Sequence, residues 1–166
     1  MTSESSRRTL LRGLALAPFL WLARSRRAES RDYSSPAEVL GTIDSLEADV
    51  AGRLQAIAAT LASARPLATS FLADHARHRR VRATVRERLR LAGPPIAGPP
   101  KPAPSKSERA LDGLRAAQEA LVYAHAEGLP AIGDPAAVDG LARNMIDLAR
   151  HLAVIDLWLE AEAARD

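Results

Sequence analysis

Two short strings that combine acidic residues with histidine recur along the chain. Asp74–His78 (DHARH) is echoed by Asp147–His151 (DLARH), and Glu47–Val50 (EADV) is echoed by Glu119–Val122 (EALV). An aspartate and a histidine four residues apart lie on one face of a helix, where they can pair as ions or act together as ligands. The echo indicates an internally duplicated helical protein, and coincidence in a chain rich in Ala and Arg is the alternative.

Four helices must position these residues. Apolar residues recur at spacings of three and four, and no alternating strand pattern appears anywhere in the chain. The predicted helices cover about 36–64, 66–92, 106–127 and 135–163. The fold class is therefore all-α, a four-helix bundle made of two hairpins.

Local signals mark the helix boundaries. Ser35 can cap the first helix, with Pro36 in its first turn and Glu38 at the spacing of a capping box. Pro66 opens the second helix, Gly128–Pro130 is expected to end the third, and Asp134 is expected to cap the fourth.

A proline-rich linker, residues 93–105, separates the two hairpins. It contains the string GPPIAGPPKPAP, which favours an extended conformation. At about 3.1 Å per residue it reaches roughly 37 Å, close to the roughly 39 Å length of the second helix. The linker is therefore long enough for the third helix to run parallel to the second.

The first thirty residues resemble a twin-arginine export signal. Arg7 and Arg8 lie in the string SRRTLLR, ahead of a short apolar run, Gly13–Ala23, that ends before further arginines. This run is too short for a membrane span of about 20 residues. Residues 1–30 are therefore predicted to be a signal peptide read by the twin-arginine translocation machinery. An ordinary secretory signal or an uncleaved anchor is the alternative.

Composition restricts the remaining functions. The formal net charge is +3, and the arginines and glutamates of residues 1–30 contribute about +4, which leaves the rest of the chain nearly neutral. Nucleic acid is therefore not an expected partner. The chain has no cysteine, which excludes disulfides, thiolate metal sites and cysteine catalysis. The basic residues between Arg77 and Arg90 are expected to form a solvated helix face.

The order of elements resembles the ferritin-like family. The string His78-Arg79-Arg80, the residues Leu89 to Gly93 and the proline run that follows are similar to a group of exported bacterial ferritin-like domains of undefined role. Di-metal members of the family take a glutamate from each of two helices and a Glu-x-x-His motif from each of the other two. By position, the resemblance implies six metal ligands and iron or manganese as the metal. These ligands are Glu47, Asp74, His78, Glu119, Asp147 and His151.

The chain departs from that pattern in two ways. It contains no Glu-x-x-His, and its Asp-x-x-x-His strings carry a shorter carboxylate. Glu47 also lies about 26 Å from the first turn, whereas Asp74 and His78 lie only about 12–18 Å beyond it. This difference in level closes only if the first helix ends several residues early.

Other roles for these residues stay open. Glu47 is expected to pair with Arg82 or Arg86 if it binds no metal. His75 and His78 then become histidines at the edge of the core, and each Asp-x-x-x-His string becomes an ion pair within its own helix.

The expected function follows from export and the bundle. We expect an exported ferritin-like protein that holds iron or manganese for redox or storage chemistry. It is expected in the periplasm or cell envelope, either released there or retained by an uncleaved N-terminal anchor. The alternative is a metal-free bundle that binds an envelope protein or forms a homodimer. No nucleophile elbow or glycine-rich phosphate loop is present, so we do not expect a catalytic enzyme.

Overall fold

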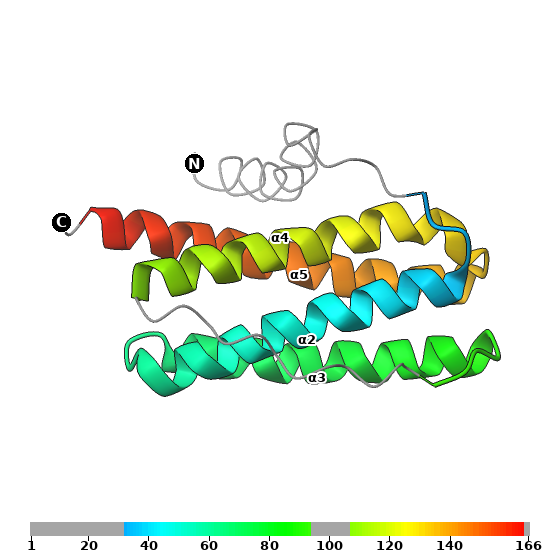
Figure 1. The fold of residues 1–166 in the computed structure, drawn as a ribbon, viewed down its shortest axis with the longest axis horizontal. Coiled ribbons are helices and arrows are strands. Elements are labelled where there is room, and N and C mark those ends of the chain that lie inside the picture. The colour runs from blue at the N-terminus through cyan, green and yellow to red at the C-terminus, as the bar shows by residue number, and fades with distance from the viewer. Residues whose placement is uncertain (1–31, 94–106, 165–166) are drawn as a thin grey trace, which may run out of the picture. The chain divides into compact units, whose positions relative to one another are not determined.

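The computed structural model describes residues 32–93 and 107–164, which belong to one compact unit, Asp32–Asp166 (Figure 1). These residues form four helices and no strand: α2 (Pro36–Thr60), α3 (Arg65–Arg88), α4 (Ser107–Ile132) and α5 (Pro135–Ala163). The all-α prediction is confirmed. The signal with Arg7 and Arg8, and most of the proline linker, lie outside the described residues.

The four helices pack as a bundle of two hairpins. α2 packs against α3 and α4, and α5 packs against α4 and α3. Figure 1 shows that α3 and α4 run in the same direction, so α4 starts at the end of the bundle opposite to where α3 stops. The parallel course of α3 and α4, which the length of the linker was predicted to allow, is therefore confirmed.

Aliphatic side chains from α2, α4 and α5 fill the core. The largest fully buried ones are Leu40, Ile43, Leu54, Ile57, Leu121, Leu141, Leu148 and Ile155. All of them except Leu40 belong to the predicted apolar stripes. None of the four described helices has an apolar stretch long enough to cross a membrane. α3 is the exception to aliphatic packing, because its buried residues include two histidines and two arginines.

Both predicted helix caps are present. The Ser35 hydroxyl accepts a hydrogen bond from the N–H of Glu38 at 3.3 Å, and the Glu38 carboxylate reaches back to the N–H of Ser34 at 2.9 Å. The Asp134 carboxylate accepts a hydrogen bond from the N–H of Ala137 at 2.9 Å. These bonds satisfy N–H groups that a helix start otherwise leaves without partners.

The first hairpin turns earlier than predicted. α2 ends at Thr60, Leu61 is extended, and Leu61–Ala64 form the turn. Pro66 lies in the first turn of α3, so the preceding helix has to end before it. α3 ends at Arg88 and not at residue 92. There, Arg90 has a left-handed φ of 53°, and the N–H of Leu91 donates to the carbonyl of Arg86 at 2.9 Å. This is a Schellman stop with arginine at the position usually taken by glycine.

The predicted stop of α4 at Gly128–Pro130 is wrong. The helix continues to Ile132 and ends at Gly133, which has a φ of 70°. Pro130 lies in the last turn of the helix, so the backbone hydrogen bond that it removes is one near the helix end. Gly128 instead allows α4 to approach α2, since a Cβ there would lie 2.4 Å from Cγ1 of Val39.

Candidate metal centre

Glu47 lies inside the bundle on the buried face of α2, with only 4% of its surface exposed. Because α2 ends at Thr60, Glu47 precedes the end of α2 by as many residues as His78 follows the start of α3. The two residues therefore lie at the same level of the hairpin. The early end of the helix removes the difference in level that the sequence predicted.

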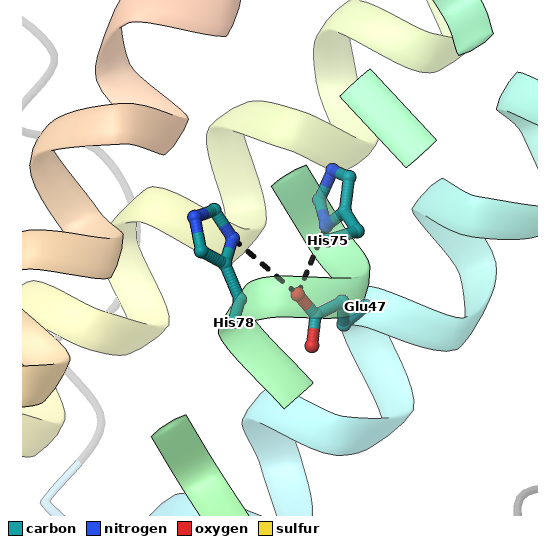
Figure 2. A group of neighbouring side chains, drawn as sticks. All are labelled: Glu47, His75 and His78. Carbon is teal, nitrogen blue, oxygen red and sulfur yellow. Dashed lines mark hydrogen bonds and ion pairs between the residues drawn. The ribbon is translucent and has the colours of Figure 1, made fainter. Parts of the chain in front are cut away.

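Glu47 meets two histidines of α3. Its Oε1 lies 2.9 Å from Nδ1 of His75 and 3.6 Å from Nδ1 of His78 (Figure 2). His75 and His78 are each 2% exposed. Each of the three residues offers one ligand atom, and these atoms lie within 4.8 Å of one another.

This spacing suits a small metal ion. Two ligands bound tetrahedrally at about 2.0–2.2 Å are roughly 3.3–3.6 Å apart. The distances of 2.9 and 3.6 Å from Glu47 Oε1 to the two histidines lie close to that range. Small side-chain shifts would therefore bring the three atoms around one ion.

The histidines are neutral at pH 7. Burial lowers the pKa of His75 to about 4. Burial also lowers the pKa of His78, against the opposing effect of Asp147. Neutral imidazole is the form that binds a metal.

Two arginines of α3 balance the acidic residues of α2. Arg82 pairs with Oε2 of Glu47, and its Nε donates to Asp44 at 2.7 Å. Arg86 donates to the second oxygen of Asp44 at 2.5 Å. The prediction of a solvated basic face is therefore wrong for Arg82 and Arg86, which are 3% and 7% exposed. The alternative pairing of Glu47 with Arg82 is confirmed and leaves Oε1 facing the histidines.

The Asp-x-x-x-His strings pair between helices. The structure joins Asp74 of α3 to Nε2 of His151 on α5 at 2.9 Å. It brings Asp147 of α5 to 3.6 Å from Nε2 of His78 on α3. The interpretation as ion pairs within each helix is wrong, because the two antiparallel strings face each other and each aspartate lies nearer the opposite histidine.

Glu119 lies in a separate group of ion pairs. It accepts a hydrogen bond from Arg115 at 3.1 Å, and Arg115 also donates to Asp156 at 2.6 Å. Its side chain is 26% exposed. The neighbouring Gln118 is the buried residue and donates to the carbonyl of Leu148 at 3.2 Å. The buried polar group of the second hairpin is therefore the amide of Gln118, whereas that of the first hairpin is the carboxylate of Glu47.

Two further histidines complete the polar core. His151 stacks on Phe71 with ring centroids 3.9 Å apart, and burial lowers its pKa to about 4. His125, whose pKa burial also lowers to about 4, has Nδ1 2.9 Å from the carbonyl of Leu121. All four histidines of the chain are thus buried. His75 was not among the candidate ligands predicted from the sequence, although its place on the apolar stripe of α3 indicated that it is buried.

Ring nitrogens of these histidines lack partners within the described part of the chain. No hydrogen bond reaches Nε2 of His75 or His125, Nδ1 of His151, or either ring nitrogen of His78. Buried polar atoms without partners are rare, and a bound ion or water is a common reason for them. The polar core is therefore the strongest candidate for a ligand site among the described residues.

Comparisons with known proteins identify no family. No family model matches the chain, and no curated protein or solved structure is significantly similar to it. The resemblance to ferritin-like proteins therefore stays a prediction.

Proposed function

We propose that this protein is an exported four-helix bundle that binds a divalent transition-metal ion between α2 and α3. The proposed ligands are Oε1 of Glu47 and one ring nitrogen each of His75 and His78. The observation that carries the proposal is the convergence of these three buried groups within 4.8 Å.

The arrangement around His78 supports a cation over a simple buried ion pair. Its Nδ1 faces Glu47 and its Nε2 faces Asp147, each at 3.6 Å. A neutral imidazole has one N–H, so it can donate to only one of these two carboxylates. The other nitrogen directs a lone pair toward a carboxylate oxygen. A metal ion between a nitrogen and an oxygen turns that repulsion into two favourable contacts.

The ligand types suggest which metal binds. Two imidazoles and one carboxylate form the usual set of non-haem iron(II) sites and of some zinc sites. Magnesium and calcium prefer oxygen ligands, so a site with two imidazoles does not suit them. We therefore propose iron or zinc first and manganese next. One centre is proposed in place of a metal pair, because Glu119 pairs with Arg115 and the buried position beside it is Gln118.

Export and fold complete the proposal. Arg7 and Arg8 in the string SRRTLLR support twin-arginine export, a route that carries folded proteins. The parallel course of α3 and α4 supports a ferritin-like topology. We propose that the folded bundle takes up the metal in the cytoplasm and carries it to the cell envelope, where it serves storage or redox chemistry.

Metal titration of the purified full chain tests the proposal. We expect one equivalent of Zn²⁺ or Fe²⁺ by isothermal calorimetry and elemental analysis. Glu47→Gln should abolish binding, because it removes the only charged ligand. Glu119→Gln is the matched control and should bind as the wild type does, because this residue lies outside the group.

Two results would contradict the proposal. One is a wild-type protein that binds no iron, zinc or manganese, which would favour the metal-free bundle. The other is equal loss of binding in both variants, which would return Glu119 to the ligand set.

A further inference from the structure

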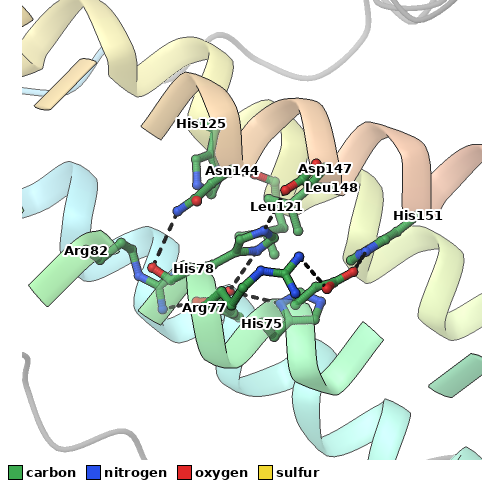
Figure 3. A network of polar contacts seen from close by, with 12 residues as sticks. His75, Arg77, His78, Arg82, Leu121, His125, Asn144, Asp147, Leu148 and His151 are labelled. Carbon is green, nitrogen blue, oxygen red and sulfur yellow. Dashed lines mark hydrogen bonds and ion pairs between the residues drawn. The ribbon is translucent and has the colours of Figure 1, made fainter. Parts of the chain in front are cut away.

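A second set of polar and charged residues lies along the line where α3 and α5 meet, here called the α3–α5 seam. It consists of Asp74, Arg77 and His78 on α3 and Asp147, Arg150 and His151 on α5. Figure 3 labels four of them, Arg77, His78, Asp147 and His151. Among the neighbouring helix pairs in the described structure, α3 and α5 make the sparsest contact.

Each aspartate of the seam joins an arginine to a histidine. Asp74 pairs with Arg77 at 2.6 Å through Oδ1 and with His151 at 2.9 Å through Oδ2. Asp147 pairs with Arg150 at 2.9 Å through Oδ1 and faces His78 at 3.6 Å through Oδ2. The two halves are related by an approximate two-fold exchange of α3 and α5.

Exposure falls steadily from arginine to histidine. The side chains of Arg77 and Arg150 are 55% and 74% exposed, and those of Asp74 and Asp147 are 21% and 34% exposed. Behind them, the side chain of His78 is 2% exposed. Carboxylates at the surface are therefore followed directly by a buried imidazole.

His78 connects this seam to the proposed metal site. Its Nε2 has no hydrogen-bond partner among the described residues and faces Asp147, while its Nδ1 faces Glu47. Groups able to bind a cation thus form a continuous line from the solvent to the core, through Asp147, His78 and Glu47. Oδ2 of Asp147 lies 3.6 Å from Nε2 of His78, and Nδ1 on the other side of the same ring lies 3.6 Å from Oε1 of Glu47.

We infer that the α3–α5 seam is the entry route of the metal, with Asp74 and Asp147 as the residues that capture it. This inference rests on the proposed function. Without a cation, Arg77 and Arg150 balance the two carboxylates. An arriving divalent ion takes over that role, displaces the arginines toward solvent, and passes by way of His78 to Glu47 and His75.

A route differs from a ligand in its effect on binding. Removing a ligand raises the dissociation constant of the metal. Removing a residue of the route slows entry and exit alike and leaves the dissociation constant nearly unchanged. Surface carboxylates that attract a cation are worth about 10-fold or more in association rate at low salt. Rate and affinity measured together therefore separate the two roles.

The test uses Co²⁺ as the probe, because its absorbance reports binding in stopped-flow and in titration. We expect Asp74→Asn/Asp147→Asn to slow association about 10-fold and to leave the dissociation constant within about 3-fold, a change under 0.7 kcal/mol. The control is Asp49→Asn/Asp139→Asn, which removes the same charge from two other ion pairs. It should change the rate little.

A second variant keeps the test decisive if the first does not fold. Arg77→Gln/Arg150→Gln removes the arginine partner of each carboxylate and should speed association. Unchanged association rates in both seam variants would overturn the inference. A raised dissociation constant at an unchanged association rate would also overturn it. A wild-type chain that binds no Co²⁺ would instead reject the metal site itself, and the entry route with it.

Discussion

Arg82 of α3 and Asp44 of α2 are joined by an ion pair in which Nε donates to Oδ1 at 2.7 Å. The same carboxylate binds Arg86 through its other oxygen. Asp44 thus holds two buried guanidinium groups against α2, and it lies three residues before Glu47 on the same face of the helix. The basic character of α3 is part of its packing.

Asp44→Asn should destabilise the fold by about 3–5 kcal/mol, because the amide leaves two buried positive charges without full compensation. Urea denaturation measures the change. Asp139→Asn, which breaks an exposed pair with Arg143, should cost less than about 1 kcal/mol. A similar small effect of both variants would show that water or Glu47 alone compensates Arg82.

Arg90→Gly should stabilise the protein by about 1 kcal/mol. Arg90 adopts a φ of 53°, which glycine adopts without the steric penalty of a Cβ. Arg90→Ala is the control, since it removes the charge and keeps the Cβ. Equal stabilisation by both substitutions, measured by thermal unfolding, would assign the effect to charge instead of backbone conformation.

Gly128→Ala and Gly41→Ala should have opposite effects. The first places a methyl group 2.4 Å from Cγ1 of Val39, which forces α4 away from α2 and should cost about 1–3 kcal/mol. The second meets nothing within 4 Å and should stabilise α2 by about 0.5–1 kcal/mol. Adding Val39→Ala to Gly128→Ala should restore part of the loss in chemical denaturation, beyond the independent effects of the two changes.

The metal-free protein should lose stability as the pH falls from about 6.5 to about 4. Burial lowers the pKa of His75, His125 and His151 to about 4 in the folded state, so the unfolded chain binds more protons in this range. The stabilisation is complete above the unfolded pKa and disappears as the pH approaches the folded one. One such group contributes up to about 3 kcal/mol.

His125→Leu isolates one of these contributions. The substitution removes a buried proton-binding group that lies outside the proposed ligands, so the stability of the variant should depend less steeply on pH between 6.5 and 4. Urea midpoints at several pH values measure this slope. An unchanged slope would mean that His125 does not control the response to acid.

The sequence predicted the architecture because its signals are local. The caps at Ser35 and Asp134 and the apolar spacing of three and four depend only on neighbours along the chain. The helix ends were less accurate, because Arg90 takes a conformation usual for glycine and Gly128 serves helix packing.

The candidate site was predicted only in part for the same reason. Whether Glu47 meets His78 depends on where α2 ends, and an error of four residues moves a side chain by about 6 Å along a helix. Glu119 entered the ligand set through the resemblance, whereas the spacing of Leu114, Gln118 and Leu121 places Gln118 on the buried stripe of α4. The pairing of Asp74 with His151 depends on how two helices distant in sequence lie against each other.

The burial of all four histidines makes the polar core directly observable in solution. Imidazole nitrogens resonate apart from backbone amides in nitrogen-15 NMR spectra, so in the untagged protein each such signal arises from a residue of this core. Tautomer, protonation and metal coordination can then be followed at each ring without a mutation. The histidines thus act as built-in reporters for the interior of the bundle.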